Sequence, residues 1–201
     1  MPIKAIIFDM GDVLIQHDDT LEHTAVQAMC TDPEYAGTRI PQLIPFDRVH
    51  RGELTFADLF RLLAEEVGLT ADYPAFASAM TSGFGPPIPG IAHVVDSLTE
   101  RFSLALLSNT NAVHWSYAKS HYAALLDKVR PHFVSFELGM MKPQPEIFRH
   151  VVAALGVEPK DCLLIDDNEA NGQGARVAGL DEIRFRSSEQ LIAELEARDV
   201  L

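Results

Sequence analysis

The chain has 201 residues, of which 47% are hydrophobic, and a formal net charge of −13. These values argue against a disordered chain and allow one domain, or one domain with a sizeable insertion. An acidic surface repels phosphate backbones, so nucleic acid is not expected as a partner, whereas a small phosphorylated ligand is not excluded. No apolar run reaches the roughly 20 residues of a membrane span. The N-terminus has no signal-peptide layout, so we predict a cytoplasmic protein with no membrane partner.

Five short apolar runs are predicted to be strands, at residues 3–8, 103–107, 132–136, 161–165 and 182–185. Their apolar residues occupy both parities, which is typical of central strands covered on both faces. Helical patterns, with apolar residues three and four positions apart, lie at residues 112–126, 144–155, 171–178 and 188–197. This alternation predicts right-handed crossovers and therefore an α/β fold with a doubly wound parallel sheet.

The stretch between residues 17 and 84 breaks the alternation. It contains helical patterns at residues 21–29, 55–67 and 73–80 and no convincing strand. Residues 83–90 are rich in glycine and proline and are interpreted as a stiff return linker before a helix at 90–99. We therefore predict a core made of residues 1–16 and 85–201, with an all-helical cap at 17–84 inserted into it.

Polar residues follow three of the predicted strands, and a lysine lies in a loop between them. In chain order they are Asp9, Ser108, Asn109, Lys142, Asp166 and Asp167. Each has an ordinary explanation when taken alone: a turn aspartate, a helix N-cap, a surface lysine or an acidic helix start. However, ligands of such sheets bind at the carboxyl ends of the strands, so we expect these residues to converge.

The residue types suit phosphoryl transfer. The carboxylate of Asp9 can attack a phosphoryl group and form an acyl phosphate. Hydroxyl and N–H groups of Ser108 and Asn109, at a helix start, can hold phosphate oxygens. Lys142, which Pro143 biases towards extended backbone, can neutralise the developing charge.

The adjacent carboxylates of Asp166 and Asp167 indicate a cation site. Neighbouring like charges repel, so such pairs usually need a cation or a proton. Magnesium suits them because it prefers oxygen ligands and keeps waters for the substrate. The sequence therefore predicts Mg²⁺ as the cofactor.

Together these motifs resemble those of the haloacid dehalogenase-like hydrolase superfamily. The similarity covers most of the predicted core, and within the superfamily the chain resembles the bacterial α-D-glucose-1-phosphate phosphatase branch. The resemblance implies that Asp9 is the nucleophile and a metal ligand, together with the carbonyl of Gly11 and the carboxylates of Asp166 and Asp167. It also implies that Ser108, Asn109 and Lys142 bind the transferring phosphate, and that the helical cap selects the leaving group.

Gly11 departs from the commonest pattern of this superfamily, which places an aspartate there as general acid and base. Loss of such a group typically costs about 10²–10⁴-fold in rate. The related sugar-phosphatase branch also has glycine, so inactivity does not follow. Either a sugar 1-phosphate supplies an easier leaving group, or Asp12 acts through a water; we favour a simple turn role for Asp12.

The predicted function is a magnesium-dependent phosphatase that acts on a small phosphorylated metabolite, such as a sugar phosphate, through an aspartyl phosphate. Two alternatives stay open: a 2-haloacid dehalogenase, which the acidic pair disfavours, and a catalytically weak ligand-binding protein, which Gly11 favours. Substrate contacts are conceivable for several residues, although packing or solvent exposure is the simpler reading: His50, Arg48, Arg51, His114 and Trp115. The sequence defines neither the substrate nor the oligomeric state.

Overall fold

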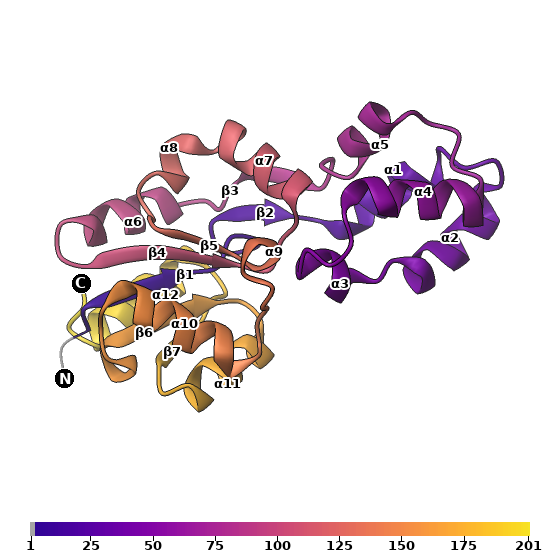
Figure 1. Ribbon diagram of the computed structural model, residues 1–201. Coiled ribbons are helices and arrows are strands. Elements are labelled where there is room, and N and C mark those ends of the chain that lie inside the picture. Colours follow the sequence, from indigo (N-terminus) through magenta and orange to yellow (C-terminus); the bar gives the residue numbers. More distant parts are fainter. Residues whose placement is uncertain (1–2) are drawn as a thin grey trace.

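The computed structural model describes residues 3–201. A sheet covered by helices lies beside a separate group of helices (Figure 1). Met1 and Pro2 lie outside the described residues. The prediction about the N-terminus and the start of the predicted core rest partly on these two residues. Among residues 3–201, no helix combines the length and the apolarity needed to cross a bilayer.

The main sheet has five strands in the order β5-β4-β1-β6-β7, and every neighbouring pair is parallel. The strands are β1 (Ala5–Phe8), β4 (Ser103–Ser108), β5 (His132–Val134), β6 (Cys162–Asp166) and β7 (Asp181–Arg184). The predicted doubly wound α/β fold is therefore confirmed. In the central strand, Phe8 pairs with Leu106 on one side and Ile165 on the other. This register places Asp9 at the same edge as the ends of β4 and β6.

Period-two alternation along these buried strands builds a core on each face of the sheet. In β1, Ile6 and Phe8 join one core cluster, whereas Ala5 and Ile7 join the other. The first cluster is covered by α6 (Ile91–Thr99), α7 (Ala112–His121), α8 (Ala123–Leu126) and α12 (Ser188–Ala197). The second is covered by α10 (Pro145–Leu155) and α11 (Glu169–Val177).

Two predicted element bounds differ from the structure. The helix expected over residues 112–126 is interrupted at Tyr122, which has φ −120° and ψ 24° and separates α7 from α8. The strand expected over 132–136 ends at Val134, and the chain turns into the short helix α9 (Ser135–Leu138). A single-turn 3₁₀ helix, η1 (Pro159–Asp161), precedes β6.

The separate helical group has its own apolar core. Its helices are α1 (Asp19–Gln27), α2 (Pro33–Leu43), α3 (Phe46–His50), α4 (Phe56–Val67) and α5 (Tyr73–Ala79). Buried side chains such as Val26, Ile40, Leu63 and Phe76 pack together there, apart from the two sheet cores. The sequence analysis did not predict α2 and α3; Asp32 caps α2 with Pro33 in its first turn, but Pro41 inside the helix obscures the pattern. The exact domain boundaries remain a prediction.

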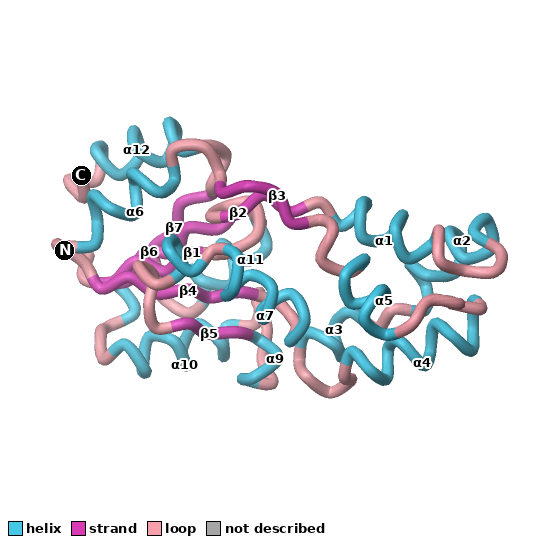
Figure 2. Tube along the Cα trace, turned by 90° about the horizontal axis from the view of Figure 1, so that it is seen from above, coloured by secondary structure: helices cyan, strands magenta, loops and turns pink. Residues whose placement is uncertain are grey.

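A two-stranded antiparallel ribbon joins the two units. It consists of β2 (Ile15–His17) and β3 (Phe84–Pro87), so both ends of the helical segment leave the sheet side by side, as Figure 2 shows from above. The sequence predicts a return linker over residues 83–90, but part of this segment forms the strand β3. Pro86 and Pro87 are tolerated because a ribbon of two strands leaves one edge of each unpaired.

Candidate active site

A cavity of about 400 Å³ lies between the two units, at the carboxyl ends of the central strands. The α/β unit contributes Asp9, Asn109, Asn111, His114, Lys142, Asp167, Asn168 and Asn171 to its lining, and β2 contributes His17. The helical group contributes Asp19, Glu22, His23, Ile44, Phe46, Val49, His50, Phe56, Leu59 and Met80. The cavity therefore has a polar floor and a mixed roof of apolar and titratable side chains.

Lys142 lies at the centre of the polar floor. Its side chain is 0% exposed, and its Nζ lies 2.8 Å from Asp9 Oδ1 and 2.6 Å from Asp166 Oδ2. Burial alone would lower the pKa of Lys142, but Asp166 and Asp9 raise it above its ordinary value, so the ammonium stays charged. Burial, opposed by Lys142, raises the pKa of Asp9 to about 7. Asp9, Lys142, Asp166 and Asp167 therefore lie close together in the structure, as the sequence predicts.

The loop that carries Lys142 is fixed by Asn109. The side-chain amide of Asn109 donates to the Lys142 carbonyl at 2.8 Å and accepts from the Lys142 N–H at 2.8 Å. Both amide atoms are thus already engaged with a peptide group. This positioning contact was not foreseen; phosphate binding by Asn109, whose side chain also lines the cavity, stays a prediction.

Asp166 and Asp167 differ sharply in environment, although they are adjacent. Asp166 is 2% exposed and accepts hydrogen bonds from the Asn168 N–H at 2.9 Å and from Asn171 Nδ2 at 2.9 Å, besides its contact with Lys142. Asp167 is half-buried and lines the cavity. Burial and the neighbouring Asp166 raise the pKa of Asp167, as expected for a carboxylate without its own cation.

Ligand atoms of Asp9, Asp166 and Asp167 lie within 4.8 Å of one another, which is close enough to share one metal ion. All of these atoms are carboxylate oxygens, the donor type of Mg²⁺ sites. The donor set therefore fits the predicted cation.

The segment after β4 begins α7. Ser108 is the last residue of β4 and is 2% exposed. The helix cap is Asn111, whose Oδ1 accepts from the backbone N–H groups of Val113 and His114 at 3.0 and 2.9 Å. Asn111 rather than Ser108 or Asn109 therefore caps this helix; phosphate contact by Ser108 stays a prediction.

The turn after Asp9 contains Gly11, which lacks the usual acid–base side chain, and Asp12, one of the two ways considered for compensating it. Gly11 is half-buried and forms an isolated bridge with Ile15. Asp12 is exposed, adopts a left-handed φ of 53°, and accepts the His17 N–H at 3.0 Å. This is the local turn role favoured for Asp12.

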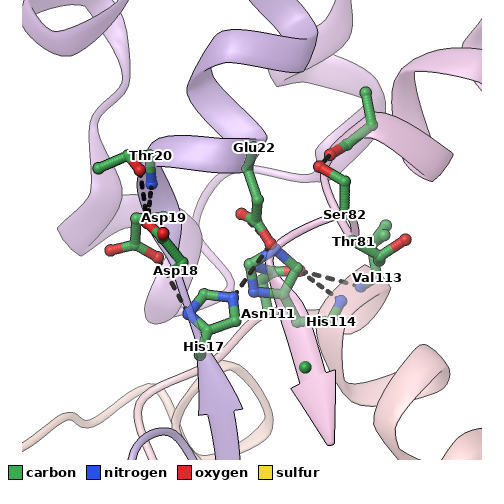
Figure 3. A network of polar contacts seen from close by, with 12 residues as sticks. His17, Asp18, Asp19, Thr20, Glu22, Thr81, Ser82, Asn111, Val113 and His114 are labelled. Atoms are coloured by element: carbon green, nitrogen blue, oxygen red, sulfur yellow. Dashed lines mark hydrogen bonds and ion pairs between the residues drawn. The ribbon is translucent and has the colours of Figure 1, made fainter.

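A second polar cluster, not predicted from the sequence, borders the same cavity (Figure 3). His17 Nε2 lies 3.0 Å from Glu22 Oε1, and His114 Nε2 lies 3.2 Å from Glu22 Oε2. His17 Nδ1 lies 3.1 Å from Asp19 Oδ1. Burial would lower the pKa of His17, but the Asp19 and Glu22 carboxylates raise it to about 10. Only His114 had been singled out, because neither His17 nor Glu22 belongs to a sequence motif.

The other candidate contact residues are distributed differently. His50 is half-buried and lines the cavity, and burial lowers its pKa to about 4. Trp115 is 4% exposed and packs in the core of the α/β unit, as the packing interpretation holds. Arg48 is exposed, and Arg51 donates to Gln144 Oε1 at 2.9 Å, which ties the helical group to the start of α10.

Comparison with known proteins defines the class. Residues 3–179 match the haloacid dehalogenase-like hydrolase family, so the chain belongs to this family of enzymes. It is 26% identical over 175 residues to D-ribitol-5-phosphate phosphatase of Bacteroides thetaiotaomicron, covering 84% of this chain and 85% of that protein.

Two further matches place this relationship in context. A solved enzyme of the same family from Bacteroides thetaiotaomicron, in complex with magnesium and inorganic phosphate, superposes with a TM-score of 0.80 at 25% identity, covering 92% of this chain and 95% of that one. Bifunctional epoxide hydrolase 2 of Sus scrofa is 25% identical over 223 residues, but the chain spans only 39% of its length.

Proposed function

We propose that this protein is a Mg²⁺-dependent phosphatase that hydrolyses a small phosphorylated metabolite, such as a sugar phosphate, through an aspartyl phosphate formed on Asp9. The observation that supports it most directly is the buried Lys142 ammonium, 2.8 Å from Asp9 and 2.6 Å from Asp166, at the floor of a cavity. The phosphatase relative named above supports the reaction class.

The residues divide the chemistry between them. Asp9 attacks phosphorus in line with the leaving oxygen, and water then hydrolyses the acyl phosphate. Lys142, held by Asn109, neutralises charge on the transferring group, where a buried ammonium is more effective than in water. Ser108 and Asn109 hold the phosphoryl oxygens at the start of α7.

The metal would be held by Asp9, Asp167 and the Gly11 carbonyl. When bound, it supplies charge neutralisation to the phosphoryl oxygens. Asp166 is already saturated by Asn168, Asn171 and Lys142, so we assign it to positioning Lys142 and to contact with the metal through water. This assignment predicts that Asp167→Asn weakens metal affinity more than Asn171→Ala does.

The cavity limits the leaving group. Its volume of about 400 Å³ suits a small metabolite, and its roof offers apolar contacts from Phe56, Leu59 and Met80. Among the described residues that line the cavity, Lys142 is the one lysine or arginine, and it is engaged with Asp9 and Asp166. We therefore expect monophosphates of uncharged compounds to be better substrates than bisphosphates.

The test is release of inorganic phosphate from p-nitrophenyl phosphate and from a panel of metabolite monophosphates, with Mg²⁺ and with a chelator. We expect turnover that needs Mg²⁺ and falls to background in Asp9→Asn, with covalent phosphate detectable by rapid acid quench in the wild type alone. Chelator-resistant release of halide from a 2-haloacid would instead establish the dehalogenase alternative. Absence of turnover on every compound would favour a ligand-binding protein.

A further inference from the structure

Gly11 has no side chain that could donate or accept a proton in the proposed reaction. Expelling an alkoxide and activating water both require a proton carrier beside the scissile bond. Asp12 is exposed and committed to the turn through its contact with the His17 N–H. Unless the leaving group is as easily expelled as that of a sugar 1-phosphate, another side chain is needed to supply the proton.

The side chain that lies beside Gly11 is that of His17. A Cβ added to Gly11 would have one heavy-atom neighbour within 4 Å outside the adjoining residues, the His17 Cβ at 3.8 Å. The imidazole of His17 extends from there along the cavity wall towards α1, and its side chain is 17% exposed. His17 thus lines the same cavity as Asp9, and its Cβ lies beside the turn that follows Asp9.

Two carboxylates of unequal mobility hold this imidazole (Figure 3). The side chain of Glu22 is 3% exposed; its Oε1 lies 3.0 Å from His17 Nε2 and its Oε2 lies 3.2 Å from His114 Nε2, so this carboxylate is buried between the two imidazoles. The side chain of Asp19 is 73% exposed, so its contact with Nδ1 is readily exchanged. Both partners stabilise the protonated ring, consistent with the raised pKa of His17.

We propose that His17 is a catalytic residue of the phosphatase reaction: it protonates the leaving oxygen and then accepts a proton from the attacking water, in place of the side chain that Gly11 lacks. This inference rests on the proposed phosphatase function. Glu22 is the positioning residue, and His114 holds Glu22.

The proton transfers balance over one cycle. As the Asp9 carboxylate bonds to phosphorus and the bond to the leaving oxygen breaks, the Nδ1 proton moves from His17 to that oxygen, which departs as an alcohol. The ring is then neutral and keeps its Nε2 proton on Glu22. When water attacks the acyl phosphate and the bond to Asp9 breaks, one water proton returns to Nδ1 and inorganic phosphate is released.

The experiment compares leaving groups that differ in their need for a proton. The phenolate of p-nitrophenyl phosphate departs without one at neutral pH, whereas an alkyl or sugar alkoxide does not. In His17→Gln we expect the first-turnover rate of alcohol release from an alkyl phosphate to fall by about 10²–10⁴-fold and that of p-nitrophenolate release to change less than about tenfold. The first turnover is compared because the later hydrolysis of the acyl phosphate is common to both substrates. His93→Gln, an exposed histidine on α6, is the matched control and should change neither rate.

A rescue variant separates chemistry from folding. Gly11 has no left-handed φ, and the nearest atom to an added Cβ is at an ordinary contact distance of 3.8 Å, so the backbone at this position accepts a Cβ and Gly11→Asp is a suitable variant. We expect Gly11→Asp combined with His17→Gln to regain at least tenfold in alkyl phosphate turnover over His17→Gln alone. A folding defect would not be repaired in this way.

The possible outcomes separate the phosphatase function from the role of His17 in it. If the wild type hydrolyses neither substrate, the proposed phosphatase function fails. If the wild type hydrolyses both, and His17→Gln lowers both first-turnover rates equally or neither, His17 is not the proton donor to the leaving group although the enzyme is a phosphatase.

Discussion

At the scale of single residues, the buried charges at the floor of the cavity dominate. The side chain of Lys142 is 0% exposed, and its ammonium compensates the charges of two carboxylates, those of Asp9 and Asp166. Removing one partner of a buried ion pair leaves an uncompensated charge, which costs more than the pair itself contributes. Lys142 is therefore expected to matter for folding as well as for chemistry.

Lys142→Met should abolish phosphatase activity and lower the free energy of unfolding by about 3–5 kcal/mol, because Asp9 and Asp166 then lie unpaired. Urea unfolding measures the loss. Lys142→Met combined with Asp166→Asn, which removes one orphaned charge, should recover part of this stability. If the double variant is less stable than Lys142→Met, the pairing seen here does not govern the site.

The imidazole of His17 makes stability depend on pH. Its folded-state pKa of about 10 lies above the ordinary value of 6.5, so its protonation stabilises the fold fully below pH 6.5 and stops doing so as pH rises towards 10. The titratable groups facing it are Asp19 and Glu22 on α1 and His114 on α7. The difference in unfolding free energy between wild type and His17→Gln should therefore be larger at pH 6 than at pH 10. A difference that grows with pH would contradict this assignment.

At the scale of elements, α11 is pressed against the loop that positions Lys142. A Cβ on Gly174 would lie 2.0 Å from the Pro143 carbonyl oxygen, whereas a Cβ on Gly172, in the same helix, would meet the flexible Glu182 carboxylate at 2.8 Å. The Glu182 side chain can rotate away from an added Cβ, whereas the Pro143 carbonyl can move only if the backbone shifts. The lysine loop and α11 are thus packed at a distance that only glycine permits.

This pair of glycines gives a matched test. Gly174→Ala should destabilise the fold by about 1–3 kcal/mol and reduce turnover, because the displaced backbone adjoins Lys142. Gly172→Ala should range from neutral to about 1 kcal/mol stabilising, since alanine is the better helix former and only Glu182 must move. Thermal unfolding with parallel assays measures both. Equal effects of the two substitutions would argue against close backbone packing at Gly174.

At the scale of the whole molecule, the helical group and the α/β unit have separate apolar cores. Each core contains one of the two cysteines: Cys30 is 7% exposed in the helical group, and Cys162 is 0% exposed in β6. Burial raises the pKa of both thiols, to about 11 for Cys162, so neither is expected to react in the native protein. Each cysteine therefore reports on the opening of its own unit.

We expect Cys30 to become reactive at a lower urea concentration than Cys162, because the smaller helical core should open first. Pulse labelling with a thiol reagent, read by peptide mass spectrometry and normalised to the unfolded rates, measures both midpoints. Coincident midpoints would mean that the two units unfold as one.

Much of the α/β unit was predictable because its signals are local. Fully apolar strands such as residues 161–165, followed directly by charged residues, define both the strand and its functional end. The sequence motif at Asp166 and Asp167 was visible, but their unequal roles were not. That difference depends on Asn171 and Lys142, which reach Asp166 only through packing.

The parallel α/β architecture, the hydrolase family and the polar residues at the strand ends can all be predicted from the amino-acid order, since hydrophobic periodicity and motifs span only a few residues. Other features become visible only in the folded molecule: Asn109 holds Lys142, β2 pairs with β3, and His17 lies beside Gly11 and contacts Glu22. The physical reason is that these contacts join segments distant in the chain, and a contact between such segments is set by how the folded units pack rather than by any local pattern.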